Sequence, residues 1–318
     1  MIVYPYKPIS SLKSLSIVLC ISEQELHYIY MNSDSYYFLT KDIIKNDGSH
    51  RLTYDVKSKL KTIHDKITKL ILKKVNYPDY LQGSLSGKDF ISNAKNHSKK
   101  RIIISEDITN FFPSISKEII YQTFSKLFNF SPIVCDILSK LVTYKGYLVQ
   151  GCKTSSYLCN LVLWNREKAL VDNFKKKGFT YTRYVDDIHI SSNSFINNDE
   201  KEYIIKKVYN LMRSINVKPN RKKHKIMTND NSQSVHGVIV NKKAAFSKEY
   251  RNEIRGLVFN CQKKFKLSIN EKEYTKFYQS VLGKVNLLKR LNENEAKKHL
   301  NTLSKIKPIH FKEKEKHD

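Results

Sequence analysis

The sequence predicts an α+β fold in which helices surround an antiparallel sheet. An apolar, β-branched run at residues 101–108 is typical of a buried strand and brings Asp107 to its end. Two short strands at 179–184 and 188–192 flank Val185-Asp186-Asp187 as a hairpin with acidic residues at its tip. Most of the remaining chain has apolar residues at helical spacing. We therefore expect a small sheet that carries carboxylates at one end.

Helices are expected before, between and after these strands. Residues 1–45 are interpreted as a helical lead-in, and Leu60, Ile63, Ile67 and Leu70 mark the apolar face of an amphipathic helix. The other predicted elements are helices at 117–141, 155–174 and 200–215, a short strand at 235–241, and a basic helical segment from 247 to a charged tail after Pro308. With nine Gly and seven Pro in the whole chain, no flexible linker is expected, and the elements should pack as one body.

A large excess of positive charge predicts a polyanionic partner. The 318 residues include 57 Lys and Arg against 30 Asp and Glu, which gives a formal net charge of +27 spread along the whole chain. Such a surface attracts nucleic acid through its phosphates. The alternative is that part of this charge is ordinary solvated lysine, so the motifs must decide between the two interpretations.

Cysteine usage and hydropathy bear on the compartment. The five cysteines are scattered without a C-x-x-C pair, which argues against a disulfide framework or a zinc ribbon and indicates a reduced, cytoplasmic protein. The apolar run near the N-terminus, residues 16–21, is far shorter than the roughly 20 residues of a membrane helix. No membrane partner is expected.

Asp107, Asp186 and Asp187 are the candidate catalytic carboxylates. Adding a nucleotide to a primer requires an activated attacking oxygen and a stabilised pyrophosphate leaving group, and two Mg²⁺ ions about 4 Å apart supply both. Magnesium is held by one or two carboxylates together with phosphates and water. A strand ending in Asp107 beside a hairpin that presents the other two would provide these ligands. An isolated Asp-Asp pair is more often ordinary turn chemistry, so the assignment depends on further motifs.

The order of several motifs resembles that of reverse transcriptases over about residues 50–290. The segment from Asp107 to Ser114, DITNFFPS, resembles the first catalytic block of that family, and Tyr184-Val185-Asp186-Asp187 matches its Y-x-D-D block without departure. The resemblance implies a right-hand polymerase fold with an antiparallel palm sheet, interleaved fingers and a helical thumb. It also implies the following metal ligands for two Mg²⁺ ions: Asp107, Ile108, Asp186 and Asp187.

The resemblance further implies a site for deoxynucleoside triphosphates. Gln150 and Gly151 match a block usually written L-P-Q-G-A-P-x-S-P, whose prolines are absent here. Phe112 corresponds to the aromatic residue that excludes a 2′-OH and so selects deoxynucleotides. Arg51 resembles the fingers arginine that binds the triphosphate, and Tyr184 is assigned to the same site.

Lys223 is a candidate catalytic residue, although an interpretation without a catalytic role is also open. It keeps the N-x-x-K spacing with Asn220, and the resemblance places it near the leaving pyrophosphate, where an ammonium group can neutralise charge or donate a proton. The alternative is a solvated basic turn, because lysines are dense in this segment.

Two shorter elements resemble those of bacterial retron enzymes. The segment from Asn93 to His97 fits the retron N-A-x-x-H element, and Val235-His236-Gly237 resembles the retron V-T-G element with histidine in place of threonine. The resemblance assigns these positions to RNA binding and subfamily identity: Asn93, Ala94, His97, Val235, His236 and Gly237.

The implied organisation is an N-terminal helical extension (1–45), interleaved fingers and palm (46–242), and a helical thumb with a basic tail (243–318). A retron enzyme would copy part of a cognate structured non-coding RNA into single-stranded DNA, starting from an RNA 2′-OH, to give a branched RNA–DNA product. That product would act with an effector protein in defence against phage. Two alternatives stay open. One is a group II intron-like or diversity-generating reverse transcriptase, which would lack N-A-x-x-H. The other is a non-catalytic RNA scaffold, which three uncompensated carboxylates in a basic groove oppose.

Overall fold

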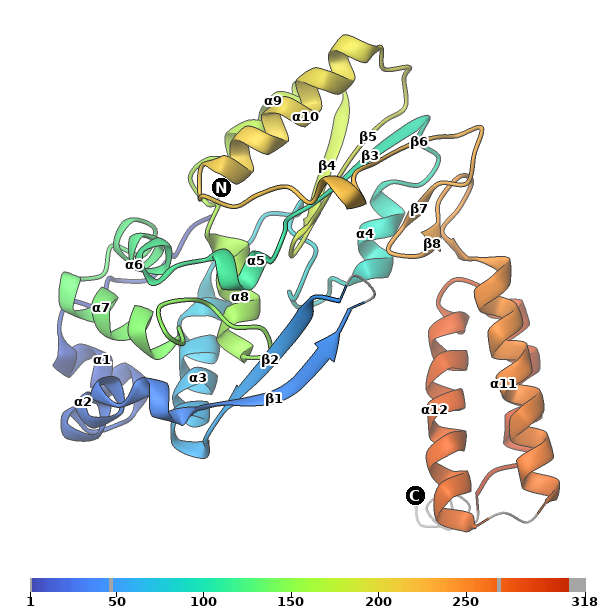
Figure 1. The fold of residues 1–318 in the computed structure, drawn as a ribbon, viewed down its shortest axis with the longest axis horizontal. Coiled ribbons are helices and arrows are strands. Elements are labelled where there is room, and N and C mark those ends of the chain that lie inside the picture. Colours follow the sequence, from blue (N-terminus) through green and yellow to red (C-terminus); the bar gives the residue numbers. More distant parts are fainter. Residues whose placement is uncertain (1, 46–47, 268–269, 309–318) are drawn as a thin grey trace. The chain divides into compact units, whose positions relative to one another are not determined.

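The computed structural model describes residues 2–45, 48–267 and 270–308, and it divides into two compact units (Figure 1). Unit 1 comprises residues 1–96 and 100–228, and unit 2 comprises residues 97–99 and 229–318. The structure therefore differs from the single body expected from the scarcity of glycine and proline. Residues 229–242, predicted as part of the palm, group with unit 2. The predicted tail after Pro308 lies outside the described residues.

A four-stranded antiparallel sheet forms the centre of unit 1. Its strand order is β4-β5-β3-β6. The strands are β3 (Ile102–Asp107), β4 (Phe179–Tyr184), β5 (Asp187–Ser192) and β6 (Lys225–Thr228). The three predicted strands are confirmed, because their β-branched and aromatic side chains are buried on the two faces of the sheet. β6 was not predicted, since it is an edge strand whose residues remain exposed or half-buried.

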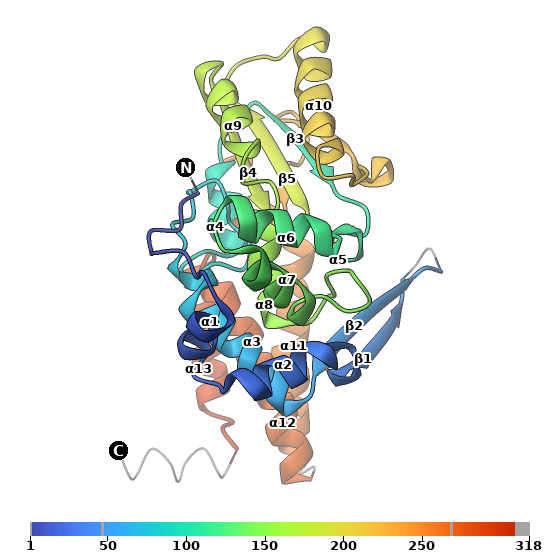
Figure 2. The same ribbon diagram turned by 90° about the vertical axis from the view of Figure 1, so that its left-hand side faces the viewer.

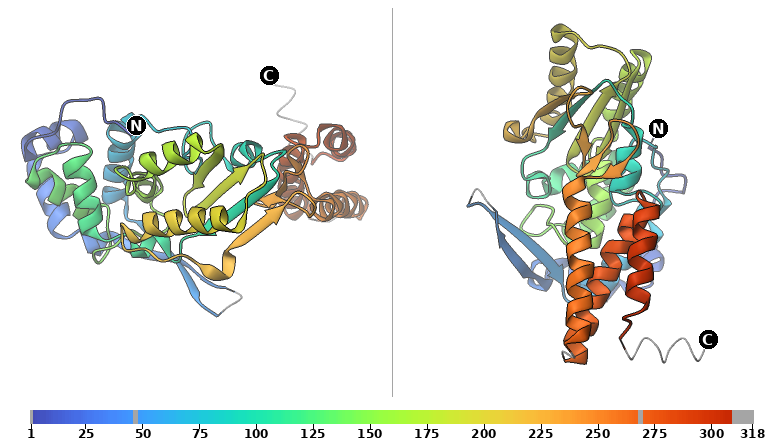
Figure 3. Two further views of the ribbon diagram at one scale, coloured as in Figure 1. Left: turned by 90° about the horizontal axis from the view of Figure 1, so that it is seen from above. Right: turned by 90° about the vertical axis from the view of Figure 1, so that its right-hand side faces the viewer.

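Two helices cover one face of this sheet (Figures 1 and 3). They are α9 (Glu167–Lys176) and α10 (Asn198–Arg213). They lie side by side, and Tyr203 Oη donates to Asn173 Oδ1 between them at 2.9 Å. Phe174 of α9 packs against Phe179 and Tyr181 of β4, with ring centroids 6.0 and 6.2 Å apart. Aromatic packing between α9 and β4 therefore supports the β4–β5 hairpin on one face of the sheet.

Two segments predicted as single helices are each divided. Residues 117–141 form α6 (Lys117–Lys126) and α7 (Pro132–Leu141). The break occurs because Asn129 has a left-handed backbone and Pro132 lacks the N–H that a continuous helix requires. Residues 155–174 belong to α8 (Lys153–Leu161) and α9, separated by turns at 162–166. The prediction of one helix in each segment was wrong.

The N-terminal helices complete the core of unit 1. They are α1 (Leu12–Leu19), α2 (Glu23–Met31) and α3 (Ser58–Leu70). The predicted apolar face of α3 is confirmed, since Leu60, Ile63 and Ile67 are buried in the same cluster as Leu15 and Leu26. Shorter elements are η1 (Ser33–Tyr36), η2 (Leu72–Lys74), α4 (Phe90–Asn96), α5 (Phe111–Ser114) and η3 (Arg221–Lys223).

A two-stranded ribbon replaces the end of the predicted helical lead-in. Residues 37–44 form β1 (Tyr37–Ile44), which pairs antiparallel with β2 (His50–Val56) from Tyr37↔Val56 to Ile44↔His50. The ribbon projects from the helices of unit 1 (Figure 2), and all of β1 after Tyr37 is exposed. The prediction of helix to residue 45 was therefore wrong at its end.

Unit 2 contains a small sheet and three long helices. Its strands are β7 (Ser234–Val235), β8 (Val238–Ile239) and β9 (Ala245–Phe246). The predicted strand at 235–241 is instead a hairpin, because His236 and Gly237 take positive φ values of 51° and 76° and make its turn. The helices are α11 (Lys248–Lys266), α12 (Glu271–Lys289) and α13 (Glu293–Ser304), as predicted for the basic segment. No helix in the described part of the chain is both long and apolar enough to cross a membrane.

Candidate active site

The sheet brings the three predicted carboxylates together. Asp107 is the last residue of β3 and lies directly opposite Asp187, the first residue of β5. Asp186 occupies the turn between β4 and β5, and its carbonyl oxygen accepts a hydrogen bond from the N–H of Ile108 at 3.1 Å. Antiparallel pairing therefore places residues that are far apart in sequence at one end of the sheet.

This arrangement concentrates negative charge in a partly buried place. Burial, together with repulsion from Asp186 and Asp107, raises the pKa of Asp187 to about 7. Burial and the charge of Asp107 also raise the pKa of Asp186, while Lys223 and Arg51 oppose that shift. Lys223 Nζ donates to Asp107 Oδ2 at 2.9 Å. Like charges held this close favour a cation between them.

The carboxylates fit a metal ion whose coordination is completed by oxygens of the substrate. Asp187 and Asp107 are hydrogen-bonded to each other. Within the described residues, no three acidic, histidine or cysteine side chains converge as ligands of one ion. Magnesium needs only one or two carboxylates when phosphates and water supply the remaining oxygens. The donor set therefore fits a divalent cation whose coordination is completed by oxygens of the substrate, and it is not a closed protein cage.

Lys223 belongs to a loop that is anchored to β3. Asn220 donates its N–H to the carbonyl oxygen of Asp107 at 2.7 Å, and the N–H of Lys223 bonds to the carbonyl of Asn220 at 2.9 Å. Next to it, His224 Nδ1 and Glu106 Oε1 are hydrogen-bonded at 2.7 Å. The spacing of the N-x-x-K motif thus fixes a turn against the catalytic strand. The turn is exposed, and its backbone is held to the end of β3.

The segment of Gln150 and Gly151, here called the glycine loop, is joined through its backbone to β2, the strand predicted to belong to the fingers. Tyr54 donates its N–H to the carbonyl of Gln150 at 2.8 Å. Gly151 has φ of 111°, and a Cβ on it would lie 2.3 Å from the carbonyl oxygen of Tyr54. Only glycine fits this approach, so the loop is fixed although the family's prolines are absent. Arg51 lies on the same strand and is exposed.

Phe112 and Tyr184 flank the carboxylates in sequence and are both half-buried. Phe112 lies in α5 beside the buried Phe111, with ring centroids 6.1 Å apart. Tyr184 pairs with Asp187 in the β4–β5 register. Burial raises the pKa of the Tyr184 hydroxyl, so it stays protonated.

The sequence did not lead us to expect a buried ion pair next to the turn between β4 and β5. Arg183 Nε lies 2.6 Å from Glu167 Oε1, and both side chains are 0% exposed. A signal was present, because Phe179, Tyr181 and Arg183 alternate on one face of a predicted strand, where an arginine requires a buried partner. The adjacent segment also went unnoticed: a Cβ on Gly83 would lie 2.6 Å from Val185.

The two elements that resemble retron enzymes are mostly interior. Asn93 and Ala94 are buried in α4 of unit 1, while His97 is buried in unit 2. Val235 is also buried, and burial lowers the pKa of His236 to about 4. The side chains at these positions therefore contribute to packing, and His236 and Gly237 present the accessible part of the second element.

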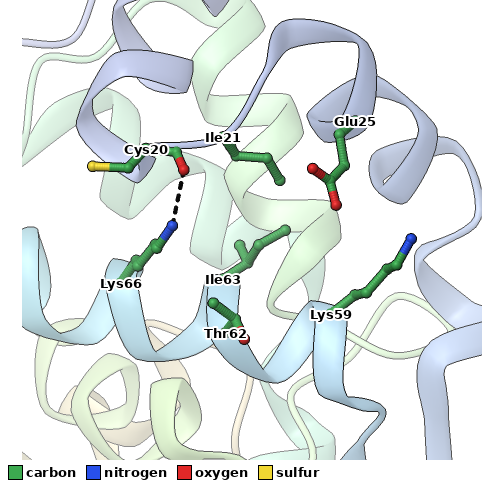
Figure 4. A pocket seen from close by; sticks show the side chains of 7 residues that line it. All are labelled: Cys20, Ile21, Glu25, Lys59, Thr62, Ile63 and Lys66. Atoms are coloured by element: carbon green, nitrogen blue, oxygen red, sulfur yellow. Dashed lines mark hydrogen bonds between the residues drawn. The ribbon is translucent and has the colours of Figure 1, made fainter.

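Two hollows in unit 1 lie away from the carboxylates. One, of about 210 Å³, lies between the α1–α2 segment and α3 (Figure 4). There Lys66 Nζ donates to the carbonyl of Cys20 at 2.9 Å, which caps the end of α1. The other, of about 240 Å³, is lined by Gly151, His64 and Lys153 among others. The first contains none of the predicted site residues, and we assign it no functional role.

Comparison with known proteins identifies a family for this chain. Residues 43–278 match the family described as Reverse transcriptase (RNA-dependent DNA polymerase). The chain is 37% identical over 312 residues to the Retron Se72 reverse transcriptase of Salmonella heidelberg (strain 579083-10), covering 95% of this chain and 81% of that protein. It is 30% identical over 319 residues to the Retron Ec48 reverse transcriptase of Escherichia coli, covering 95% and 77% respectively.

The fold also has a weaker likeness to a solved structure. Apo telomerase from Candida tropicalis, truncated from its C-terminal domain, matches with a TM-score of 0.44 and 10% identity, covering 71% of this chain and 61% of that one. The family assignment does not depend on this likeness.

Proposed function

This chain belongs to the reverse transcriptase family as a retron-type RNA-directed DNA polymerase, and from that premise we propose that it copies part of a cognate structured non-coding RNA into single-stranded DNA. Synthesis starts from a 2′-OH of that RNA and leaves a branched RNA–DNA product. The observation that supports this proposal is the convergence of Asp107, Asp186 and Asp187 at one end of the sheet, with Lys223 bonded to Asp107.

Four residues are proposed as the ligands of two Mg²⁺ ions: Asp107, Ile108, Asp186 and Asp187. When bound, the ions activate the attacking hydroxyl and stabilise charge on the leaving pyrophosphate. Ile108 positions the turn by donating its N–H to Asp186. Lys223, which neutralises Asp107 in this structure, is proposed to turn its ammonium group toward the pyrophosphate, since its side chain is 60% exposed.

The incoming deoxynucleotide is proposed to lie between the fingers strand and the catalytic tip. Arg51 binds its triphosphate, and Gln150 and Gly151 support the base pair being formed. Phe112 excludes a 2′-OH, and Tyr184 belongs to the same nucleotide-binding site. The backbone bond between Tyr54 and Gln150 supports this scheme, because it keeps two of these elements at a fixed separation.

The remaining proposals concern partners and setting. The RNA–DNA product is proposed to stay bound and, with an effector protein, to act against phage in the cytoplasm. Three buried residues, Asn93, Ala94 and His97, are proposed to shape the N-A-x-x-H element through packing. In the second element, His236 and Gly237 are proposed to contact RNA. Among the alternatives, the retron relatives favour this function over a group II intron-like or diversity-generating enzyme and over a non-catalytic scaffold.

The proposal is tested by extracting nucleic acid that co-purifies with the protein. We expect a branched RNA–DNA molecule whose DNA part is lost in the Asp186→Ala variant. Asp199→Ala, at an exposed position in the first turn of α10, is the matched control and should keep the product. A product that persists in Asp186→Ala would exclude the catalytic assignment. Activity on a generic primer-template without any bound DNA would favour another type of reverse transcriptase.

A further inference from the structure

Arg183 lies directly beneath the catalytic turn and is entirely buried. Its Nε donates to Glu167 Oε1 at 2.6 Å, and its Nη2 donates to Glu167 Oε2 at 2.9 Å. Tyr181 Oη adds a third hydrogen bond to the same carboxylate at 2.8 Å. A bidentate pair of this kind fixes the plane of the guanidinium group.

The three N–H groups of Arg183 that do not bond to Glu167 all donate to backbone carbonyls. Nη1 donates to Cys159 and to Val185, each at 3.0 Å, and Nη2 donates to Asn160 at 3.1 Å. All five guanidinium donors are therefore used. A lysine has three donors on one nitrogen and cannot make the same set of bonds.

The bond to Val185 acts on a strained part of the backbone. Val185 has φ of 60°, a left-handed conformation that is costly for a β-branched residue and persists only where its surroundings enforce it. Its carbonyl belongs to the peptide group that leads into Asp186. Arg183 holds that carbonyl, and Ile108 holds the carbonyl of Asp186 itself. The main chain of Asp186 is thus fixed on both sides.

The other two backbone bonds reach the helix that follows the glycine loop. Cys159 and Asn160 lie in the last turn of α8, which begins two residues after Gly151. Asn160 Nδ2 also donates to the carbonyl of Gly83, the residue packed against Val185. Arg183 therefore connects the turn at Val185 and Asp186 with α8, the helix that follows the glycine loop.

A buried ion pair is a poor device for stability alone, because desolvation offsets most of its attraction and apolar residues of similar volume often do as well. We infer that Arg183, held in its plane by Glu167 and anchored on the end of α8, is a positioning residue that sets the orientation of the Asp186 carboxylate. This inference rests on the proposed catalytic role of Asp186.

The test compares Arg183→Lys with the double variant Arg183→Met, Glu167→Leu. The first keeps a charge opposite Glu167, and the second replaces the pair with apolar side chains of similar length. Leu138→Ala, a cavity variant in the buried face of α7, is the control for lost stability without contact to the turn. Primer extension with full-length protein gives kcat, the KM for dNTP and the Mg²⁺ concentration for half-maximal activity.

Both variants should lose about ten-fold or more in kcat and need more Mg²⁺, with a KM for dNTP close to that of the unmodified protein. Leu138→Ala, assayed well below its melting temperature, should keep kcat. If the double variant does not fold, Arg183→Lys decides alone. A folded variant with unchanged kcat and Mg²⁺ requirement would overturn the positioning role, and so would an equal loss in Leu138→Ala. Neither result touches the role of Asp186, which fails only if Asp186→Ala stays active.

Discussion

The turn at Val185 and Asp186 and the β1–β2 ribbon, both in unit 1, differ in how deeply their side chains are buried and in how firmly their backbones are held. At the turn, Asp107 is 4% exposed, Arg183 is 0% exposed, and main-chain carbonyls are bonded by side chains or by other strands. In the ribbon, Ile43 and Ile44 are 47% and 69% exposed, and Arg51 lies on its exposed part. On the proposed assignments, the groups that perform chemistry are fixed before substrate arrives, whereas the groups that bind substrate keep freedom to close on it. The following predictions test that contrast, starting with the largest effect.

Asp107→Asn should reduce primer extension by about 10³-fold. The amide keeps the size of the side chain and an oxygen for Lys223, but it removes a charge that a metal requires. Because it also removes repulsion toward Asp187, the melting temperature should stay equal or rise. Thermal unfolding and extension assays on the same preparation check both effects. Retention of full activity would show that Asp107 is no metal ligand.

Phe112→Ala should weaken the preference for deoxynucleotides over ribonucleotides by about 10²-fold. Its half-buried ring is proposed to occupy the space that a 2′-OH would need. The measurement is the ratio of kcat/KM for dNTP and rNTP. Phe112→Tyr retains the ring and should retain the ratio. Equal ratios in the alanine and tyrosine variants would remove Phe112 from sugar selection.

Arg51→Ala should raise the KM for dNTP by about ten-fold and change kcat less. An exposed arginine on the ribbon contributes to substrate binding and little to the folded core, so the melting temperature should not change. Lys41→Ala removes an exposed charge from the same ribbon and serves as the control. A fall in kcat alone would contradict the contrast between the ribbon and the turn.

Acid should remove the stability that the buried, uncharged His64 contributes to the folded chain. His64 of α3 is buried, and burial lowers its pKa from 6.5 to about 4. Between these values the unfolded chain binds a proton at His64 that the folded chain excludes, so the contribution of His64 to stability falls as the pH is lowered from 6.5 toward 4. From pH 7 to 5 the loss is about 2 kcal/mol, from the linkage of protonation to folding. Denaturant unfolding of His64→Gln should show a smaller loss, and an identical pH profile would contradict this assignment.

The sequence predicted the strands and the order of motifs because these depend on local patterns. The run 101–108 and the hairpin around Asp186 are encoded by β-branched residues and by turn chemistry within a few positions. The meeting of Asp107 with Asp187 followed from their positions at the ends of adjacent strands.

Other features were not predicted, either because a local signal was overlooked or because they depend on contacts between distant residues. The segment 37–44 is rich in aromatic and β-branched residues that favour a strand, a local signal that was overlooked, and it pairs with residues 50–56. The division of 117–141 was readable from Pro132 but was overlooked. The Arg183–Glu167 pair could be suspected from an arginine on an apolar strand face, yet its partner lies on a different element.

The short excursion of the chain into unit 2 at residues 97–99 limits how this enzyme can be recombined. The N–H of Lys99 donates to the carbonyl of Val240 at 2.9 Å, and His97 is buried in the same unit. Unit 2 therefore cannot be exchanged with that of a relative through a single junction in the chain. A chimera that takes residues 229–318 from a relative inherits a partner segment, 97–99, from the other parent. Swaps that include both segments should yield folded hybrids more often than swaps at a single crossover.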